Sequence, residues 1–200
     1  MGGHKNLTKG TKIKICREEY ELIKNLGALR GFQFRVWLLE RLLDKKLYVA
    51  KLAQKKDRAL TELKILFYLE KKAYPNRYYA KLEAFDDCVI YKGEKFCAML
   101  LKYLPDEGDF QPLDEYLNGR PLNKNKRKIA EKLIRRIETL HSLSIIHGDI
   151  RKENIMVQVK KASGRIGVRL IDFGLSKFAD KEIISEETEK LYRLIDKELL

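Results

Sequence analysis

The order of the periodic patterns along the chain constrains its fold more than any other feature. Up to about residue 103, alternating apolar residues predict short strands at 20–26, 32–39, 47–52, 80–91 and 95–103. One helical pattern, from Arg58 to Lys72, interrupts them. Beyond that point, helical spacing dominates at 113–118, 123–142 and 185–200, with short strands at 154–159 and 168–171. We expect Ser185 to cap the last helix, with Glu187 in its first turn. Strands first and helices later predict an α+β fold in two lobes, with a boundary near residues 104–108.

The length and apolar content agree with such an organisation. The 200 residues are 44% hydrophobic, which is enough for a core. We expect a basic N-terminal extension at 1–19, an N-terminal lobe at 20–104 and a minimal C-terminal lobe at 105–200. No apolar run reaches the length of about 18 residues that a membrane span needs. The three cysteines lack metal-site spacing and predict idle thiols in a reducing compartment, hence a cytoplasmic protein, with the nucleus or a host cell as alternatives.

The charge of the chain is strongly positive. Its 42 Lys and Arg residues against 29 Asp and Glu residues give a formal net charge of +13. This field favours polyanions such as ATP, nucleic acid, acidic proteins or anionic membrane surfaces, and it selects none of them. Basic residues cluster at 5–17, 45–58 and 124–136. A solvated lysine-rich face is the alternative explanation for each cluster.

Two polar motifs carry the candidate chemistry, IIHGDIRKENIM at 145–156 and LIDFGLS at 170–176. Phosphoryl transfer needs a carboxylate near the attacking hydroxyl and oxygen ligands for Mg²⁺. Asp149 and Asn154, on one predicted loop, can supply the base and one ligand. Asp172 leaves an apolar strand and precedes the flexible Gly174, so it can supply the main ligand.

The spacing of these motifs resembles the protein-kinase signature, H-R-D-x-x-x-x-N followed by D-F-G. The resemblance implies a two-lobed kinase-like fold whose N-terminal lobe is an antiparallel sheet with one helix. It also implies ATP and Mg²⁺ as cofactors. Asp149 is then expected to orient the hydroxyl, Arg151 to steady the γ-phosphate, and Asn154 and Asp172 to hold the metal.

The same resemblance extends to the first lobe. Lys51 in YVAK looks like the strand lysine that pairs with nucleotide phosphates, and Glu62 looks like its partner on the next helix, with Glu70 as a second candidate. Leu101 looks like the residue that guards the adenine site. The remaining nucleotide-binding positions that the resemblance implies are Gly27, Gly31, Val36, Val49, Lys102, Tyr103 and Leu104.

Several departures from the family pattern have consequences. The loop LGALRGFQFRV is not a full G-x-G-x-x-G, so a differently shaped phosphate grip is expected, and a plain hairpin turn explains Gly27 and Gly31 about as well. Gly148 replaces the arginine that reads a phosphorylated activation segment in many kinases. No proline follows Pro121, so no A-P-E motif occurs. We therefore expect a truncated helical C-terminal lobe without the usual substrate-binding subdomain.

This combination resembles small atypical kinases. Part of this combination of motifs is found in each of several groups: the kinase subunit of the KEOPS tRNA-modification complex, RIO kinases, aminoglycoside and choline kinases, and short bacterial effector kinases. The leading hypothesis is a serine/threonine protein kinase or autokinase. The alternatives are an ATP-hydrolysing switch subunit of an RNA- or ubiquitin-linked assembly, and a small-molecule kinase. A protein substrate or an activating partner, either an acidic protein or a nucleic acid, is expected, with the 124–136 helix as its contact.

Overall fold

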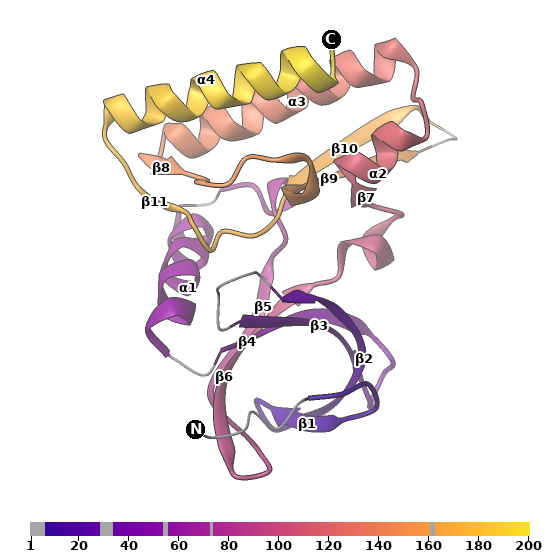
Figure 1. The fold of residues 1–200 in the computed structure, drawn as a ribbon, viewed down its shortest axis with the longest axis vertical. Coiled ribbons are helices and arrows are strands. Elements are labelled where there is room, and N and C mark those ends of the chain that lie inside the picture. Colours follow the sequence, from indigo (N-terminus) through magenta and orange to yellow (C-terminus); the bar gives the residue numbers. More distant parts are fainter. Residues whose placement is uncertain (1–6, 29–33, 54–55, 73, 161–162) are drawn as a thin grey trace. The chain divides into compact units, whose positions relative to one another are not determined.

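The computed structural model describes residues 7–28, 34–53, 56–72, 74–160 and 163–200. They form two compact units (Figure 1). Unit 1 comprises Met1–Leu63 and Lys81–Tyr103, and unit 2 comprises Lys64–Ala80 and Leu104–Leu200. Residues 64–80, which the sequence assigned to the first lobe, therefore cluster with the second. Buried contacts explain this, since the hydroxyl of Tyr74 donates to the carbonyl of Arg136.

Unit 1 is a six-stranded antiparallel sheet with the order β1-β2-β3-β4-β6-β5. Five of its strands correspond to predicted ones. The additional strand, β1, pairs with β2 and lies within the stretch expected as a basic extension. Its sequence KIKI alternates exposed lysines with buried isoleucines, as a half-buried strand requires. The strand bounds are β1 (Lys12–Ile15), β2 (Glu18–Ala28), β3 (Phe34–Arg41), β4 (Leu47–Ala53), β5 (Leu82–Tyr91) and β6 (Glu94–Lys102).

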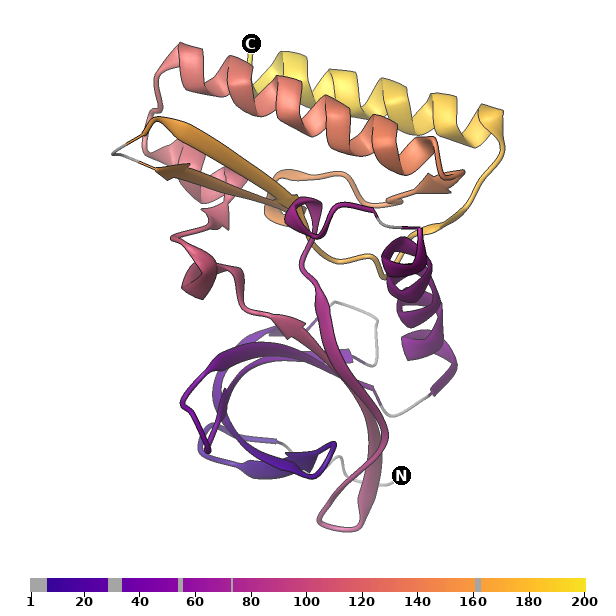
Figure 2. The same cartoon turned by 180° about the vertical axis from the view of Figure 1, so that it is seen from behind.

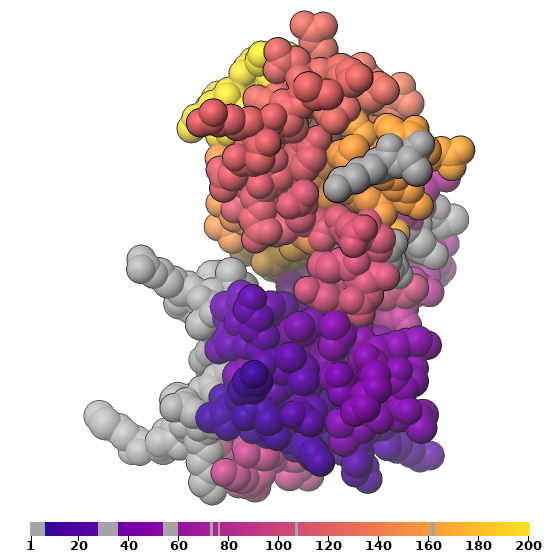
Figure 3. Space-filling model, turned by 90° about the vertical axis from the view of Figure 1, so that its right-hand side faces the viewer, coloured from indigo at the N-terminus to yellow at the C-terminus, as the bar shows by residue number. Residues whose placement is uncertain are grey.

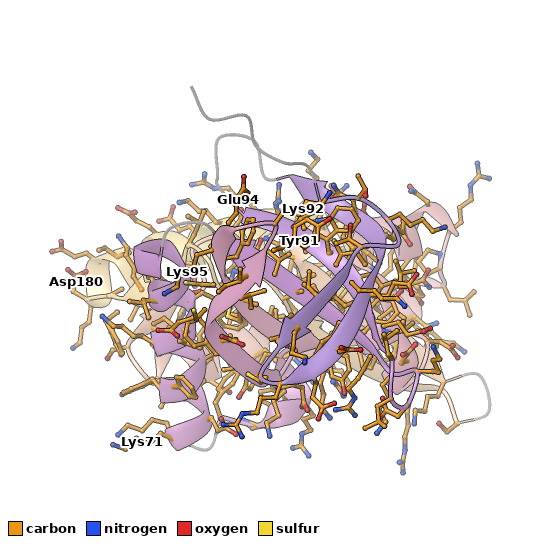
Figure 4. All side chains as sticks on the ribbon, turned by 90° about the horizontal axis from the view of Figure 1, so that it is seen from below. Lys71, Tyr91, Lys92, Glu94, Lys95 and Asp180 are labelled. Carbon is orange, nitrogen blue, oxygen red and sulfur yellow. The ribbon has the colours of Figure 1, made fainter. Side chains whose placement is uncertain are left out.

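The sheet curls until its two outer strands, β1 and β5, meet (Figures 1 and 2). The backbone N–H of Cys16 donates to Asp86 Oδ2 at 2.7 Å, and the Cys16 thiol donates to the carbonyl of Phe85 at 3.4 Å. In Figure 3 the indigo atoms of the first strands form part of the surface of unit 1. The turn of the β5–β6 hairpin is marked in Figure 4, where Lys92 lies over the ring of Tyr91. The curl encloses one hydrophobic core.

The two faces of this sheet have different roles. Alternate residues point to opposite faces of a strand, and residues that pair across strands share a face. Trp37 and Ala50, which pair between β3 and β4, belong to the enclosed core. Their neighbours Val36 and Lys51, which also pair, therefore lie on the opposite face. That face carries Val36, Val49, Lys51 and Leu101 among the candidate site residues of unit 1.

Unit 2 combines helices with short sheets. Its hairpin of β9 and β10 is extended by β7, and β8 pairs with β11. The helices are α2 (Leu113–Asn118), α3 (Asn123–His141) and α4 (Lys181–Glu198), and α1 (Lys56–Lys71) crosses the boundary between the units. The strands are β7 (Gln111–Pro112), β8 (Ile145–Ile146), β9 (Ile155–Lys160), β10 (Arg165–Leu170) and β11 (Lys177–Phe178). The 3-10 helices are η1 (Asn76–Tyr78), η2 (Leu104–Glu107) and η3 (Lys152–Asn154).

Helix α3 packs through the apolar stripe that its sequence predicts. The fully buried members of that stripe are Ile129, Leu133, Ile137 and Leu140. Helices α3 and α4 lie side by side in Figures 1 and 2. Packing of this stripe, rather than helix propensity, accounts for a long helix in so lysine-rich a sequence.

The start of α4 differs from the prediction. The cap is Asp180, whose carboxylate accepts the N–H of Ile183 at 3.0 Å, and not Ser185. Asp180 is labelled in Figure 4. Both residues are good caps. The earlier start places Glu187 inside the helix rather than in its first turn, and its side chain is buried.

The α+β class predicted from the order of patterns is confirmed. In the described part of the chain, no helix is long and apolar enough to cross a membrane. Cys16, Cys88 and Cys97 form no disulfide bonds with one another.

Candidate active site

The most buried charged pair of unit 1 joins β4 to α1. Lys51 Nζ lies 2.8 Å from each carboxylate oxygen of Glu62, and the side chains are only 6% and 1% exposed. Withdrawn from water, such a pair is held by mutual attraction, and either partner alone is costly to bury. The structure therefore joins Lys51 to Glu62, while Glu70 is exposed in unit 2.

Apolar residues surround Lys51 on the same face of the sheet. Val49 lies two residues away on β4 and pairs with Leu101 on β6, and Val36 on β3 pairs with Lys51 itself. Met99 pairs with Lys51 from the other side. Together they make a lysine ammonium flanked by aliphatic side chains, which suits a ligand with a flat apolar part and an anionic part.

The other positions expected to bind nucleotide are distributed over both units. Gly27 adopts φ +145°, which only glycine reaches without strain, and no atom lies within 4 Å of where a Cβ would be. Gly31 lies outside the described residues. Lys102 ends β6, and Tyr103 follows it, half-buried. Leu104 belongs to unit 2, where it packs with Ala80, Phe110 and Met156.

In unit 2, Asp149 and Asn154 are joined directly. The Asn154 amide donates to Asp149 Oδ2 at 2.7 Å and to the Asp149 carbonyl at 3.0 Å. Arg151 Nε lies 3.2 Å from the same carboxylate oxygen, and the Arg151 side chain is exposed. The loop between β8 and β9 therefore fixes the Asp149 carboxylate through one buried amide and one exposed guanidinium.

Asn154 and Asp172 offer oxygen atoms for a hard cation. Because the Asn154 NH₂ group donates to Asp149, its Oδ1 atom remains available as a ligand. The backbone carbonyl of Asn154 accepts the N–H of Ile171, which places Asp172 one residue further along the chain. Mg²⁺ binds proteins through one or two such oxygens and completes its shell with water and phosphate. The donor set fits Mg²⁺, although the described residues contain no group of three or more His, Cys, Asp or Glu side chains.

His147 ties this loop to the segment that carries Asp172. Its Nε2 lies 3.0 Å from the carbonyl of Ile171 and must donate, since a carbonyl only accepts. The neutral ring then presents Nδ1 as an acceptor for the Asp149 N–H at 3.3 Å. Burial lowers the pKa of His147, against the opposing influence of Glu187 and other neighbours, and so favours this neutral form. The ring also packs on Phe173 at 4.9 Å.

Glu187 holds the same loop from α4. Its carboxylate accepts the backbone N–H groups of His147 at 3.0 Å and Gly148 at 2.7 Å, and lies 2.8 Å from His141 Nε2. Burial opposes ionisation of Glu187. The hydrogen bonds from His141, Gly148 and His147 outweigh it, so the pKa of Glu187 lies below its ordinary value.

Comparison of the sequence with models of protein families identifies the family of this chain. The model of the protein kinase domain matches residues 40–192 of the chain, which include both polar motifs and the Lys51–Glu62 pair.

The chain belongs to the protein kinase family.

Other kinases agree with this assignment. The protein named Protein kinase 3 of Dictyostelium discoideum is 31% identical over 198 residues, which cover 94% of this chain and 20% of that protein. "Probable serine/threonine-protein kinase 2" of Plasmodium falciparum is 30% identical over 88 residues, 44% of this chain and 16% of that protein. The crystal structure of the BubR1 kinase domain shares the fold, with a TM-score of 0.67 at 18% identity, over 89% of this chain and 53% of that one. The chain thus spans a fifth or less of these two sequence relatives.

The structure explains why this kinase has Gly148 in place of the usual arginine. The residue adopts φ +82°, and a Cβ there would overlap the carbonyl oxygen of Leu175. The neighbouring Ser176 hydroxyl donates to the His147 carbonyl at 2.8 Å and holds the two segments together. Backbone packing against Leu175 therefore excludes a side chain at position 148.

Sequence reasoning missed two residues that the structure places beside the candidate site residues, Met99 and Glu187. Met99 is two residues from Leu101, so the strand alternation alone could have placed it on the same face. Glu187 precedes the buried Leu191 and Ile195 by four and eight residues. A carboxylate on an otherwise apolar helical stripe was the available signal.

Proposed function

We propose that the chain is an ATP-dependent serine/threonine protein kinase or autokinase that uses Mg²⁺. The observation that carries the proposal is the orientation of the buried Asn154 amide. One side chain donates to the Asp149 carboxylate and keeps its oxygen available for a metal. This arrangement links the alignment of a base to metal binding, which phosphoryl transfer requires.

In the proposed reaction, a substrate hydroxyl attacks the γ-phosphorus of ATP. The new oxygen–phosphorus bond forms as the bond to the β–γ bridging oxygen breaks, and ADP leaves. Asp149 orients the hydroxyl and accepts its proton, and the exposed Arg151 steadies the γ-phosphate. Asn154 and Asp172 would hold Mg²⁺, which would neutralise charge on the phosphates when bound.

The residues of unit 1 are proposed to bind the nucleotide. Lys51, oriented by Glu62, would contact phosphate oxygens, and Val36, Val49 and Leu101 would pack on the adenine. Backbone groups of residues 102–104 would meet its polar edge. Gly27 and Gly31 would allow the chain to approach the phosphates. These roles rest on family resemblance together with the shared sheet face of Val36, Val49, Lys51 and Leu101.

We also propose the specificity, the subfamily, the partner and the location of the kinase. Serine/threonine specificity is suggested by the name of the Plasmodium relative. Membership of an atypical subfamily is suggested by Gly148, which stands where many kinases have arginine. We further propose a protein substrate or activating partner and an intracellular location. The expected lobes at 20–104 and 105–200, preceded by a basic segment at 1–19, remain our working division for truncation experiments.

Incubation of the purified chain with γ-labelled ATP and Mg²⁺ tests the proposal. The wild type should label itself or a generic protein substrate on serine or threonine. Asp172→Ala should abolish labelling, and Asp149→Asn should slow it by about 10²-fold or more. Nucleotide binding by Asp149→Asn, measured as a thermal shift with Mg-ATP, should stay close to that of the wild type.

The control is Asp109→Asn, which changes an exposed carboxylate. It should label protein at the wild-type rate. Release of free phosphate without labelled protein would replace the proposal by an ATPase, and label on an added metabolite alone would replace it by a small-molecule kinase. Wild-type turnover by Asp149→Asn would remove Asp149 from the role of base.

A further inference from the structure

Four cationic side chains gather where η1, α3 and β10 meet in unit 2. Two of them flank one ring, since the guanidinium carbon of Arg136 lies 4.3 Å from the centroid of Tyr78 and that of Arg77 lies 5.5 Å from it. Lys132 and Arg135 lie on the adjoining turn of α3. We define the basic surface as Arg77, Tyr78, Lys132, Arg135 and Arg136.

Arg136 is the fixed centre of the basic surface. Its Nε donates to the carbonyl of Val168 at 2.6 Å, and its Nη1 donates to the carbonyl of Lys132 at 2.8 Å. The side chain is buried, and both of these acceptors are neutral. The positive charge of Arg136 is therefore held in place without a negative partner.

The same holds for the other three cations. In the part of the chain that the structure describes, no ion pair joins Arg77, Lys132 or Arg135 to a carboxylate. Burial lowers the pKa of Lys132, and the charges of Arg136, Arg135 and Arg77 lower it further. Like charges held this close raise the free energy of the folded chain, and a bound anion would relieve that repulsion.

The shape of the charge favours an extended ligand. Lys124, Lys128 and Lys132 follow one another at intervals of four residues along α3, about 6 Å apart along its axis. Lys124 and Lys128 are exposed. A row of cations that leads to Arg77 and Tyr78 suits a linear polyanion better than a single phosphate.

We propose that the basic surface binds single-stranded nucleic acid. Lys132 and Arg135 contact successive phosphates, and the exposed Arg77, supported by the Tyr78 ring, offers a flat guanidinium on which a base stacks. A cationic row beside a planar stacking group is the combination that single-strand binding uses, whereas an acidic peptide has no use for the stacking plane. The surface is independent of the phosphotransfer residues, so its test does not depend on catalytic activity.

Binding of a short labelled oligouridylate, followed by fluorescence anisotropy over a salt series, tests this proposal. The triple variant Arg77→Gln, Lys132→Gln, Arg135→Gln should weaken binding by about tenfold or more. The slope of log K against log salt should shrink by about 1.4, since the lost phosphate contacts of Lys132 and Arg135 contribute about 0.7 each on a single strand. Arg77→Lys keeps the charge and removes the plane, so it should weaken binding and leave the slope unchanged.

The matched control is Lys9→Gln, Lys12→Gln, Lys14→Gln, which removes the same charge from exposed positions of unit 1. It should lower the affinity by less than about twofold, and all variants should show wild-type circular dichroism. Equal losses in the two triple variants would mean a general field effect and overturn the proposal. It would also be overturned by absence of oligouridylate binding, or by equally tight binding of a poly-glutamate peptide of the same charge.

Discussion

Glu187 Oε1 accepts the backbone N–H of Gly148 at 2.7 Å, across 39 residues of sequence. The bond joins α4 to the loop that carries Asp149. The other oxygen, Oε2, accepts from His147 and contacts His141, so one buried carboxylate serves three donors. We therefore expect α4 to control the conformation of the Asp149 loop.

Replacing Glu187 by Gln should disturb this loop. The amide keeps one acceptor, but its NH₂ group must face an N–H donor, so at least one buried donor loses its partner. The expected cost is about 2–4 kcal/mol of unfolding free energy in urea titrations. Phosphoryl transfer should fall by about tenfold or more, with the Mg-ATP thermal shift retained. The control is Glu186→Gln at the exposed neighbouring position, which should match the wild type in stability and in phosphoryl transfer. A Glu187→Gln variant as stable and as active as the wild type would contradict the expectation.

Gly148→Ala should be destabilising for two reasons at once. The residue has a left-handed φ, and the new Cβ overlaps the carbonyl oxygen of Leu175. Gly164 has a similar φ, +61°, but nothing within 4 Å of its Cβ position. Gly164→Ala should then cost about 1 kcal/mol, and Gly148→Ala about 2 kcal/mol more. Equal midpoints for the two variants in urea would show that the contact with Leu175 is unimportant.

Lys51→Met should remove the ammonium group that faces the buried Glu62 carboxylate. We expect a loss of about 3–5 kcal/mol of unfolding free energy, measured in urea. The comparison pair is Lys45–Glu40, whose atoms are 2.9 Å apart but whose Lys45 side chain is 67% exposed. Lys45→Met should cost less than about 1 kcal/mol. The double variant Lys51→Met, Glu62→Leu should recover part of the loss, and a purely additive result would argue against a coupled pair.

Acid should destabilise the chain through His147 before it acts on Glu187. The pKa of His147 is lowered on folding, so its contribution to stability is complete above its ordinary value of about 6.5 and is lost as pH falls below it. The pKa of Glu187 is also lowered, from 4.5, so its contribution is lost only at more acidic pH. Urea midpoints between about pH 7 and pH 5 should therefore fall for the wild type. The midpoints should fall less for His147→Gln, whose amide can still donate to the carbonyl of Ile171. If the urea midpoints of the two proteins fell in parallel with pH, the loss of stability would not come from His147.

Local patterns predicted the fold class and most elements because those depend on residues near one another in sequence. The strand β1 was missed because its exposed Lys12 and Lys14 belong to a cluster of basic residues that we interpreted as an extension. The start of α4 was misplaced because Asp180 and Ser185 are both acceptable caps, and sequence alone does not tell which one turns toward the helix N-terminus.

The chemistry of the candidate site was visible in the sequence, but its supports were not. Asp149, Asn154 and Asp172 stand in recognisable motifs. The burial of Glu187 depends on where α4 packs, and the clash that requires Gly148 depends on the path of Leu175. Contacts of this kind are set by tertiary structure, so no local period reports them.

The meeting of β1 and β5 has a consequence for solubility. A sheet normally leaves two edges whose free N–H and C=O groups can recruit another chain. Here the curl turns the two edges toward each other, and Cys16 and Asp86 hold them there. Removal of the first 17 residues would uncover the edges of β2 and β5 together. The short β1 strand therefore protects the curled sheet from pairing with the sheet of another copy of the chain at high concentration.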